Sequence, residues 1–194
     1  MSHRFGPRIS VRGAGMWSRV AQWNQRSLIK SIQRGIITMT SGVTTDTATI
    51  TAVVPDHCRL IYLGAIDPAD VTVNINACRI ALTNSTTITA TVNSTSAGGS
   101  RVVSYEIQEF WPGVLRSVQR GTLSTAAAAS GTATITSVNT THATVDALGF
   151  TTTSTATEVG TNQFSLVLTN ATTITGEGLG SLTRTAGYQV IEWY

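Results

Sequence analysis

An eight-residue segment constrains this chain more than any other feature, because it occurs twice. Residues 82–89 read LTNSTTIT and residues 168–175 read LTNATTIT, an offset of 168 − 82 = 86 residues. Further segments repeat at the same or nearly the same offset: SIQRG at 31–35 with SVQRG at 117–121, and YEIQEF at 105–110 with YQVIEW at 188–193. The chain is therefore one unit written twice behind a different N-terminal segment.

The repeat divides the chain into two small domains. We expect a basic N-terminal arm at 1–30, a first β-domain at 31–110, a linker at 111–116 and a second β-domain at 117–194. Domains of this size bury only about 60–65% of the surface that their unfolded chains expose. Each domain would therefore gain stability by packing on its twin or on other chains.

The composition is that of an all-β protein. Charged residues make up only 12% of the chain, and β-branched residues crowd the interior of each repeat. Short strands of this composition between turn residues are typical of sandwiches and barrels. The sequence predicts two tandem antiparallel β-sandwich or small-barrel domains, which arise from an internal duplication and follow an extended arm. The predicted strands are 30–40, 46–54, 57–64, 71–75, 78–84, 86–93 and 101–110 in the first repeat, and 116–125, 131–138, 142–148, 163–169, 171–176 and 184–193 in the second.

Alternating apolar and hydroxyl residues indicate which strand faces point inward. In 46–54 the apolar residues at even positions share one face, which we assign to the core. Segment 82–89 predicts a hairpin in which Asn84 turns the chain by adopting a left-handed backbone conformation. The predicted core of the first repeat, with its counterparts in the second, is Ile32, Ile50, Leu60, Tyr62, Ile80, Leu82, Ile88, Tyr105 and Ile107.

Basic residues gather at the N-terminus. Seven of the 13 Lys and Arg residues lie between Arg4 and Arg34, and the first acidic residue is Asp46. Arginines neutralise phosphates, and they also form forked hydrogen bonds to carboxylates of neighbouring subunits. We interpret the arm as a segment that docks on other proteins, with nucleic acid as the less favoured partner. The predicted docking residues are Arg4, Arg8, Arg12, Trp17, Arg19, Trp23 and Arg26.

The sequence indicates no catalytic or metal-binding constellation. His57 and His142 occupy matching positions, but the neighbouring Asp56 and Cys58 of the first repeat are not repeated in the second. A catalytic site built on the duplicated histidines would need its nucleophile and its carboxylate in both copies. Cys58 and Cys78 lack the spacing of a zinc site, and we expect both to be free thiols. We therefore predict no enzymatic activity, no cofactor and no metal.

Two glutamates end the inward faces of the last strands of the repeats. Glu109 follows Tyr105 and Ile107 on one face, and Glu192 ends the second repeat in the same way. An isolated buried carboxylate costs several kcal/mol, so each glutamate is expected to have a partner. Arg34 and Arg120, near the start of each repeat, are the predicted partners in structural ion pairs.

The sequence predicts no membrane-spanning segment. No apolar run approaches the ~20 residues that cross a bilayer. The N-terminus carries arginines without the apolar stretch of a secretion signal. We expect a protein without membrane contact.

The order of the repeated motifs resembles small β-domains in virion structural proteins of tailed bacteriophages. The motifs are S(I/V)QRG, a TATIT strand, LG, LTN(S/A)TTIT and Yx(I/V)xE(F/W), in this order in both repeats. The resemblance covers 28–110 and 114–194 but not the arm. It implies a non-enzymatic component of the neck, tail, fibre or capsid exterior, made in the host bacterial cytoplasm and incorporated into the virion in multiple copies. Its partners would be other copies of itself and other virion structural proteins.

Two further classes of function remain open at this point. A host-surface or glycan-binding adhesin module would carry aromatic residues at its loop tips, and the loops at 94–100 and 176–181 have none. An enzyme is the third class, and no residues of either repeat can be assigned to it.

Overall fold

The strands of the two repeats follow the same order along the chain. The computed structural model describes residues 27–69, 72–95, 99–126, 128–153, 155, 163–178 and 182–194. In the first repeat the strands are β1 (Ile29–Met39), β2 (Thr45–Thr49), β3 (Cys58–Ile66), β4 (Cys78–Asn84), β5 (Thr87–Val92) and β6 (Arg101–Phe110). In the second repeat they are β7 (Leu115–Ser124), β8 (Ser130–Thr134), β9 (Ala143–Thr152), β10 (Phe164–Asn170), β11 (Thr173–Gly178) and β12 (Arg184–Trp193). The fold is all-β with antiparallel pairing, as the sequence predicts.

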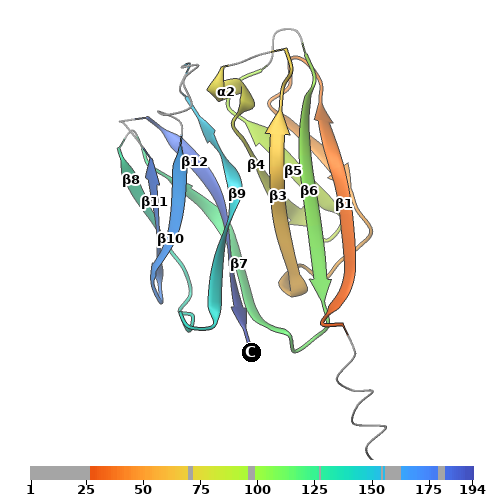
Figure 1. Ribbon diagram of the computed structural model, residues 1–194, viewed down its shortest axis with the longest axis vertical. Coiled ribbons are helices and arrows are strands. Elements are labelled where there is room, and N and C mark those ends of the chain that lie inside the picture. The colour runs from red at the N-terminus through yellow and green to blue at the C-terminus, as the bar shows by residue number, and fades with distance from the viewer. Residues whose placement is uncertain are drawn as a thin grey trace, which may run out of the picture.

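Each repeat folds as a sandwich of two sheets with the same strand order. In the first sandwich β1-β6-β3 faces β2-β5-β4, and in the second β7-β12-β9 faces β8-β11-β10 (Figure 1). β4 of the first sandwich also pairs with β9 of the second, so that β2-β5-β4-β9-β12-β7 forms one six-stranded sheet. The duplicated sequence is therefore a duplicated fold, and its two copies are joined through a shared sheet.

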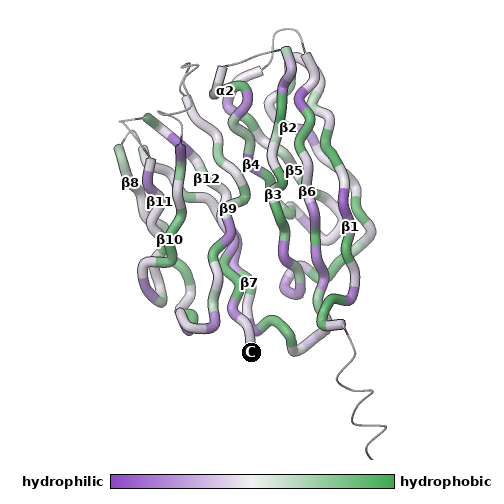
Figure 2. The backbone as a smooth tube through the Cα atoms, in the orientation of Figure 1, coloured by the Kyte–Doolittle hydropathy of each residue, from purple (hydrophilic) through white to green (hydrophobic). Residues whose placement is uncertain are grey.

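Apolar side chains from both sheets fill the interior of each sandwich. In the first sandwich Leu60 and Ile107 pack with Ile80 and Ile88, and each of the four is at most 1% exposed. Burial alternates along most of β1 and β6, so that every second residue faces the interior, and Figure 2 shows hydrophobic residues along the strands of both sandwiches. Full burial of one such side chain stabilises a fold by about 1.5–3 kcal/mol. The core thus comes from residues that the alternation places on the inner faces.

Most of the predicted core of the first repeat is confirmed, but the start of β1 has the opposite phase. The confirmed residues are Ile50, Leu60, Ile80, Ile88, Tyr105 and Ile107, with Tyr62 and Leu82 half-buried against them. Ile32 is 40% exposed, so its assignment to the core was wrong. Because Gly35 lies opposite Tyr105 and Ile37 opposite Val103, the odd-numbered residues of β1 face the core.

The duplicated hairpin closes through the side chain of its asparagine. The Oδ1 atom of Asn84 accepts a hydrogen bond from the backbone N–H of Thr86 at 2.8 Å, and Asn170 accepts one from Thr172 at 2.9 Å. The predicted left-handed conformation of Asn84 is wrong, since Ala126 is the one non-glycine residue with positive φ in the described part of the chain. An Asn side chain that bonds two residues ahead reproduces the shape of a backbone turn without that conformation.

β2 ends at Thr49, five residues before the predicted end of the strand. Gln33 explains the difference, because its side-chain amide accepts the N–H of Thr51 at 2.8 Å and donates to the C=O of the same residue at 3.0 Å. The carboxylate of Glu109 then accepts the N–H of Val54 at 3.2 Å. Two side chains therefore take the place of a neighbouring strand, and the segment leaves the sheet.

The edge strand predicted at 71–75 is also wrong. The chain instead forms the short helix α2 (Val73–Asn76) between β3 and β4. The Oδ1 atom of Asn76 accepts the N–H of Asp67 at 2.9 Å, which ties the helix to the end of β3. A side chain that satisfies a backbone donor in this way competes with strand pairing.

The segment between the two sandwiches is a tight turn packed against both. The N–H of Val114 bonds the C=O of Trp111 at 3.2 Å, and Gly113 has a positive φ of 85°. Beside the turn, Phe110 packs edge-on against Trp193, with ring centroids 5.4 Å apart. The turn is therefore accompanied by an aromatic contact between the last strands of the two repeats.

Candidate assembly interface

The contact between the two sandwiches contains hydrogen bonds and an ion pair between side chains that are far apart in the sequence. The predicted docking residues Arg4, Arg8, Arg12, Trp17, Arg19, Trp23 and Arg26 all lie outside the described residues. The described residues instead bring together the outer face of the β7-β12-β9 sheet and the β3–β4 flank of the first sandwich. We call this contact the interdomain interface.

Leu148 is the apolar centre of the interdomain interface. It lies at a β-bulge of β9, where the register against β12 shifts between Ala186 and Tyr188. Its side chain is 2% exposed and belongs to the hydrophobic core of the first sandwich. One residue later, Gly149 pairs with Arg79 of β4. The second sandwich therefore completes the core of the first.

Gly149 permits this close approach of two backbones. It has a positive φ of 81°, and a Cβ atom at this position would lie 2.1 Å from the carbonyl oxygen of Cys78. A side chain would thus be both strained and in collision with β4. Glycine is required here for the sheets of the two sandwiches to join.

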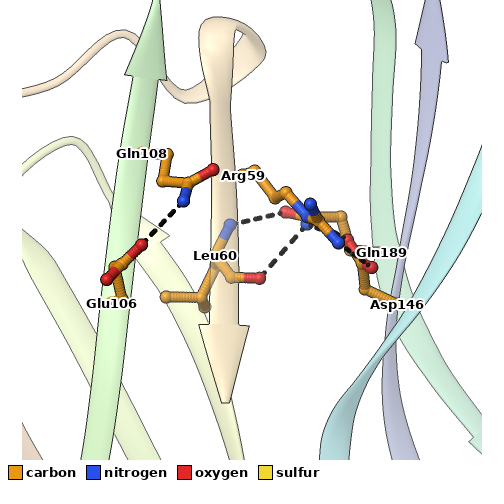
Figure 3. Close-up of polar contacts among 6 residues, drawn as sticks. All are labelled: Arg59, Leu60, Glu106, Gln108, Asp146 and Gln189. Atoms are coloured by element: carbon orange, nitrogen blue, oxygen red, sulfur yellow. Dashed lines mark hydrogen bonds and ion pairs between the residues drawn. The ribbon is translucent and has the colours of Figure 1, made fainter. Parts of the chain in front are cut away.

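Gln189 of β12 hydrogen-bonds the free edge of β3 as a neighbouring strand would (Figure 3). Its Oε1 accepts the N–H of Leu60 at 3.1 Å, and its Nε2 donates to the C=O of Leu60 at 3.2 Å. The Nε2 atom also donates to Asp146 at 3.2 Å. Because Gln189 is fully buried, both backbone groups of Leu60 are satisfied without water.

Arg59 and Asp146 form the ion pair of the interface. Two parallel hydrogen bonds of 2.9 and 2.7 Å join the guanidinium of β3 to the carboxylate of β9 (Figure 3). The hydrogen bonds to Asp146 raise the pKa of Arg59 above its usual value, against the effect of partial burial. Forked pairs of this kind fix orientation as well as energy. The pair therefore sets the angle between the two sandwiches.

Arg120 of β7 reaches across the interface to main-chain carbonyls. It donates to the C=O of Cys58 at 2.6 Å and to the C=O of Pro55 at 3.1 Å, and its Nε donates to Gln189 at 2.9 Å. Burial lowers the pKa of Arg120. The guanidinium therefore binds main-chain carbonyls at the start of η1 and at the start of β3, and so fixes the position of β7 against both.

The four residues predicted to form structural ion pairs have other partners than expected. Glu109 pairs with Lys30 at 2.9 Å, and Glu192 with Arg116 at 3.4 Å. Arg34 pairs with Glu106, and Arg120 binds the interdomain interface. Both arginines point away from their own cores, because β1 and β7 place them on outer faces. The pairing of Arg34 with Glu109 and of Arg120 with Glu192 was therefore wrong.

Three of the residues that make the interface differ between the repeats. Register aligns Gln189 with Glu106, Asp146 with Ile61, and Arg59 with Thr144. Because they are not duplicated, the repeated charges of the sequence did not predict them. In the sequence these residues appear only as positions at which the two repeats differ.

Exposed apolar side chains gather at the end of the molecule where β1 begins. Leu28, Trp111 and Tyr194 are 65%, 51% and 77% exposed. Backbone bonds join their segments, from Trp111 to Leu28 and from Tyr194 to Val114. The C-terminus and the start of β1 lie at this same end (Figure 1). We call these three side chains the arm-end patch.

The histidines and thiols have structural surroundings. His57 ends the short helix η1 (Pro55–His57) and is half-buried, while His142 is exposed. Cys58 and Cys78 are free and buried, as predicted, and burial raises their pKa values to about 12 and about 11. Both therefore remain protonated at neutral pH. Within the described ranges no group of three or more His, Cys, Asp or Glu side chains could hold a metal ion.

Comparisons with protein-family models, with curated proteins and with solved structures gave no match. No helix among the described residues is long and apolar enough to cross a membrane.

Proposed function

We propose that this chain is a non-enzymatic structural protein of a bacteriophage particle, positioned at the neck, the tail or the capsid exterior. In this proposal the basic arm anchors each copy, and the two sandwiches pack side by side with other copies. The arm-end patch is the observation that carries the proposal. Exposed clusters of large apolar side chains mark interaction surfaces, and this one lies where the arm joins the fold.

The geometry of the patch supports a docking role. Trp111 and Tyr194 are the exposed aromatic side chains among the described residues, and tryptophan and tyrosine are enriched at the energetic centres of interfaces. The backbone of Trp111 bonds Leu28, which directly precedes β1 and follows Arg26, the last of the predicted docking residues of the arm, by two positions. Arm and patch would therefore engage the same partner surface, a neighbouring virion protein.

The position of the exposed aromatic residues also favours the structural role over a glycan-binding adhesin. Adhesins place aromatic rings at loop tips that project from the particle, to stack on sugars. The exposed rings of Trp111 and Tyr194 lie instead at the end of the molecule where β1 begins. No described residue favours the adhesin.

Deletion of residues 1–26 tests the proposal. We expect the truncated chain to unfold at the same temperature as the full chain, because the described fold begins after this segment, and to be absent from purified particles when it is the only form supplied during phage assembly. Trp111→Ser is the second variant, with reduced incorporation expected. Incorporation of the truncated chain at full occupancy would disprove the docking role.

A further inference from the structure

The outer face of the β1-β6-β3 sheet carries the same bulge that the second sandwich uses for docking. The register of β3 against β6 shifts between Tyr62 and Gly64, which places Leu63 where Leu148 stands in β9. Gly64 has a positive φ of 118°, like Gly149. The two leucines differ only in surroundings, since Leu148 is 2% exposed and Leu63 is 56% exposed. A Cβ at Gly64 would meet nothing within 4 Å, so the first bulge has no partner surface within the described chain.

The charged residues of this face match as well. Arg34 occupies the position of Arg120, and Glu106, to which Arg34 donates, occupies the position of Gln189. In the second sandwich this arginine reaches across to main-chain carbonyls, whereas the side chain of Arg34 is 64% exposed. The first sandwich thus presents a free copy of the docking face.

The second sandwich, in turn, presents a copy of the receiving flank that no described residue covers as the interdomain interface covers the first. In the first sandwich the flank residues Cys58, Leu60, Cys78 and Ile80 are at most 1% exposed, beneath the interdomain interface. Their counterparts Ala143, Val145, Phe164 and Leu166 pack on the second core but are only half-buried. Phe164, which stands where the first flank has Cys78, stacks on Phe150 with ring centroids 5.9 Å apart. It therefore gives this flank a larger apolar surface than the cysteine gives the first.

We propose that copies of this chain bind one another head to tail, with the β1-β6-β3 face of one copy seated on the β9–β10 flank of the next. The contact repeats between molecules the interface that joins the sandwiches within each molecule. It rests on the multicopy assembly proposed above and names the surface through which the copies meet. A heterologous contact of this kind closes into a ring when its rotation divides a full turn, and otherwise continues as a helical filament.

Two differences from the interdomain interface define the chemistry of the contact. Ile61 replaces Asp146 and Thr144 replaces Arg59, so an apolar contact takes the place of the forked ion pair. Glu106 replaces Gln189 and can accept the N–H of Val145 but cannot donate to its C=O. The contact between copies is therefore weaker than the interface within the chain, as a reversible assembly step requires.

Charge variants of the full-length chain test the contact in solution, by sedimentation velocity over a concentration series. Leu63→Asp places a charge at the centre of the contact, and we expect at least about 30-fold weaker self-association. Thr47→Asp is the matched control, since Thr47 is an exposed strand residue on β2, at the far edge of the six-stranded sheet. It should leave self-association unchanged. Glu106→Gln should strengthen association several-fold, because it restores the amide found at Gln189.

A charge pair provides the decisive test. Ile61→Asp alone should weaken association about 10-fold or more, and Ile61→Asp combined with Thr144→Arg should restore it, because the double variant rebuilds between copies the pair that Arg59 and Asp146 form within the chain. A wild-type chain that stays monomeric at all concentrations, or a double variant no better than Ile61→Asp, would overturn the proposal. Arm docking is judged separately, because the chain lacking residues 1–26 should self-associate like the full chain even when it no longer enters particles.

Discussion

At the scale of single residues, Gly149 and Gly64 occupy equivalent positions, and a comparison of the two isolates the effect of the interdomain contact. Both have positive φ, so alanine at either position is strained by roughly 1–2 kcal/mol. Only at Gly149 would the added Cβ meet a backbone atom, the carbonyl oxygen of Cys78 at 2.1 Å. We therefore expect Gly149→Ala to lower the free energy of unfolding by about 3 kcal/mol or more and Gly64→Ala by the strain alone. Urea unfolding of both variants measures the difference, and equal losses would contradict the assigned backbone contact.

The same pair of glycines shows what the sequence could and could not reveal. The match of LG at 63–64 with LG at 148–149 identifies equivalent residues, but nothing in two identical dipeptides says that one is buried by a neighbouring sandwich and the other exposed. The interface residues Gln189 and Asp146 were missed for a related reason. Their role depends on a contact between repeats, and it appears in the sequence only as a departure from the repeat.

At the scale of elements, the end of a strand depends on side chains elsewhere in the chain, which the local alternation of apolar and hydroxyl residues does not reveal. The apolar and hydroxyl pattern predicted β4 and β6 with their observed bounds, because each has a neighbouring strand along its whole length. It placed the end of β2 five residues too late, because the amide of Gln33 binds Thr51 from a strand 18 residues earlier. Prediction of such an end requires the pairing of β1 with the rest of the sheet to be known first.

Glu109 makes the end of this segment sensitive to acid. Burial alone would raise the pKa of Glu109, but the hydrogen bonds from Lys30 and from the N–H of Val54 outweigh it and hold the pKa below its usual value. A carboxyl group whose pKa is lowered by folding stabilises the fold above its unfolded pKa, and this contribution is lost as the pH falls through the folded pKa. We expect Glu109→Gln to cost about 1–3 kcal/mol at neutral pH and to flatten the loss of stability in acid. Thermal unfolding as a function of pH checks this.

The matched control for Glu109 is the exposed Glu177 of β11. Glu177→Gln should leave both the stability at neutral pH and its decline in acid as in the wild type. Equal pH profiles for wild type and Glu109→Gln would show that the hydrogen bond between Glu109 and the N–H of Val54 contributes nothing to stability.

At the scale of the whole molecule, we expect the two sandwiches to unfold together. Leu148 lies in the core of the first sandwich, Gln189 satisfies the edge of β3, and one sheet runs through both repeats. Domains that share core residues in this way form one cooperative unit, since neither keeps its buried surface when the other opens. A single calorimetric transition is therefore expected for the full chain.

Leu148→Asp should separate that transition into two. The substitution places a charge inside the first core and removes about 2–5 kcal/mol of coupling, so the first sandwich would open at a lower temperature than the second. Leu63→Asp introduces the same change at the equivalent but exposed position, and the single transition should survive it. Two transitions in the wild type, or one undivided transition in Leu148→Asp, would mean that the interdomain interface orients the sandwiches without coupling their stability. Two sandwiches that unfold together form a rigid subunit. A rigid interdomain interface would allow the proposed contact between copies to repeat at a fixed angle from one copy to the next.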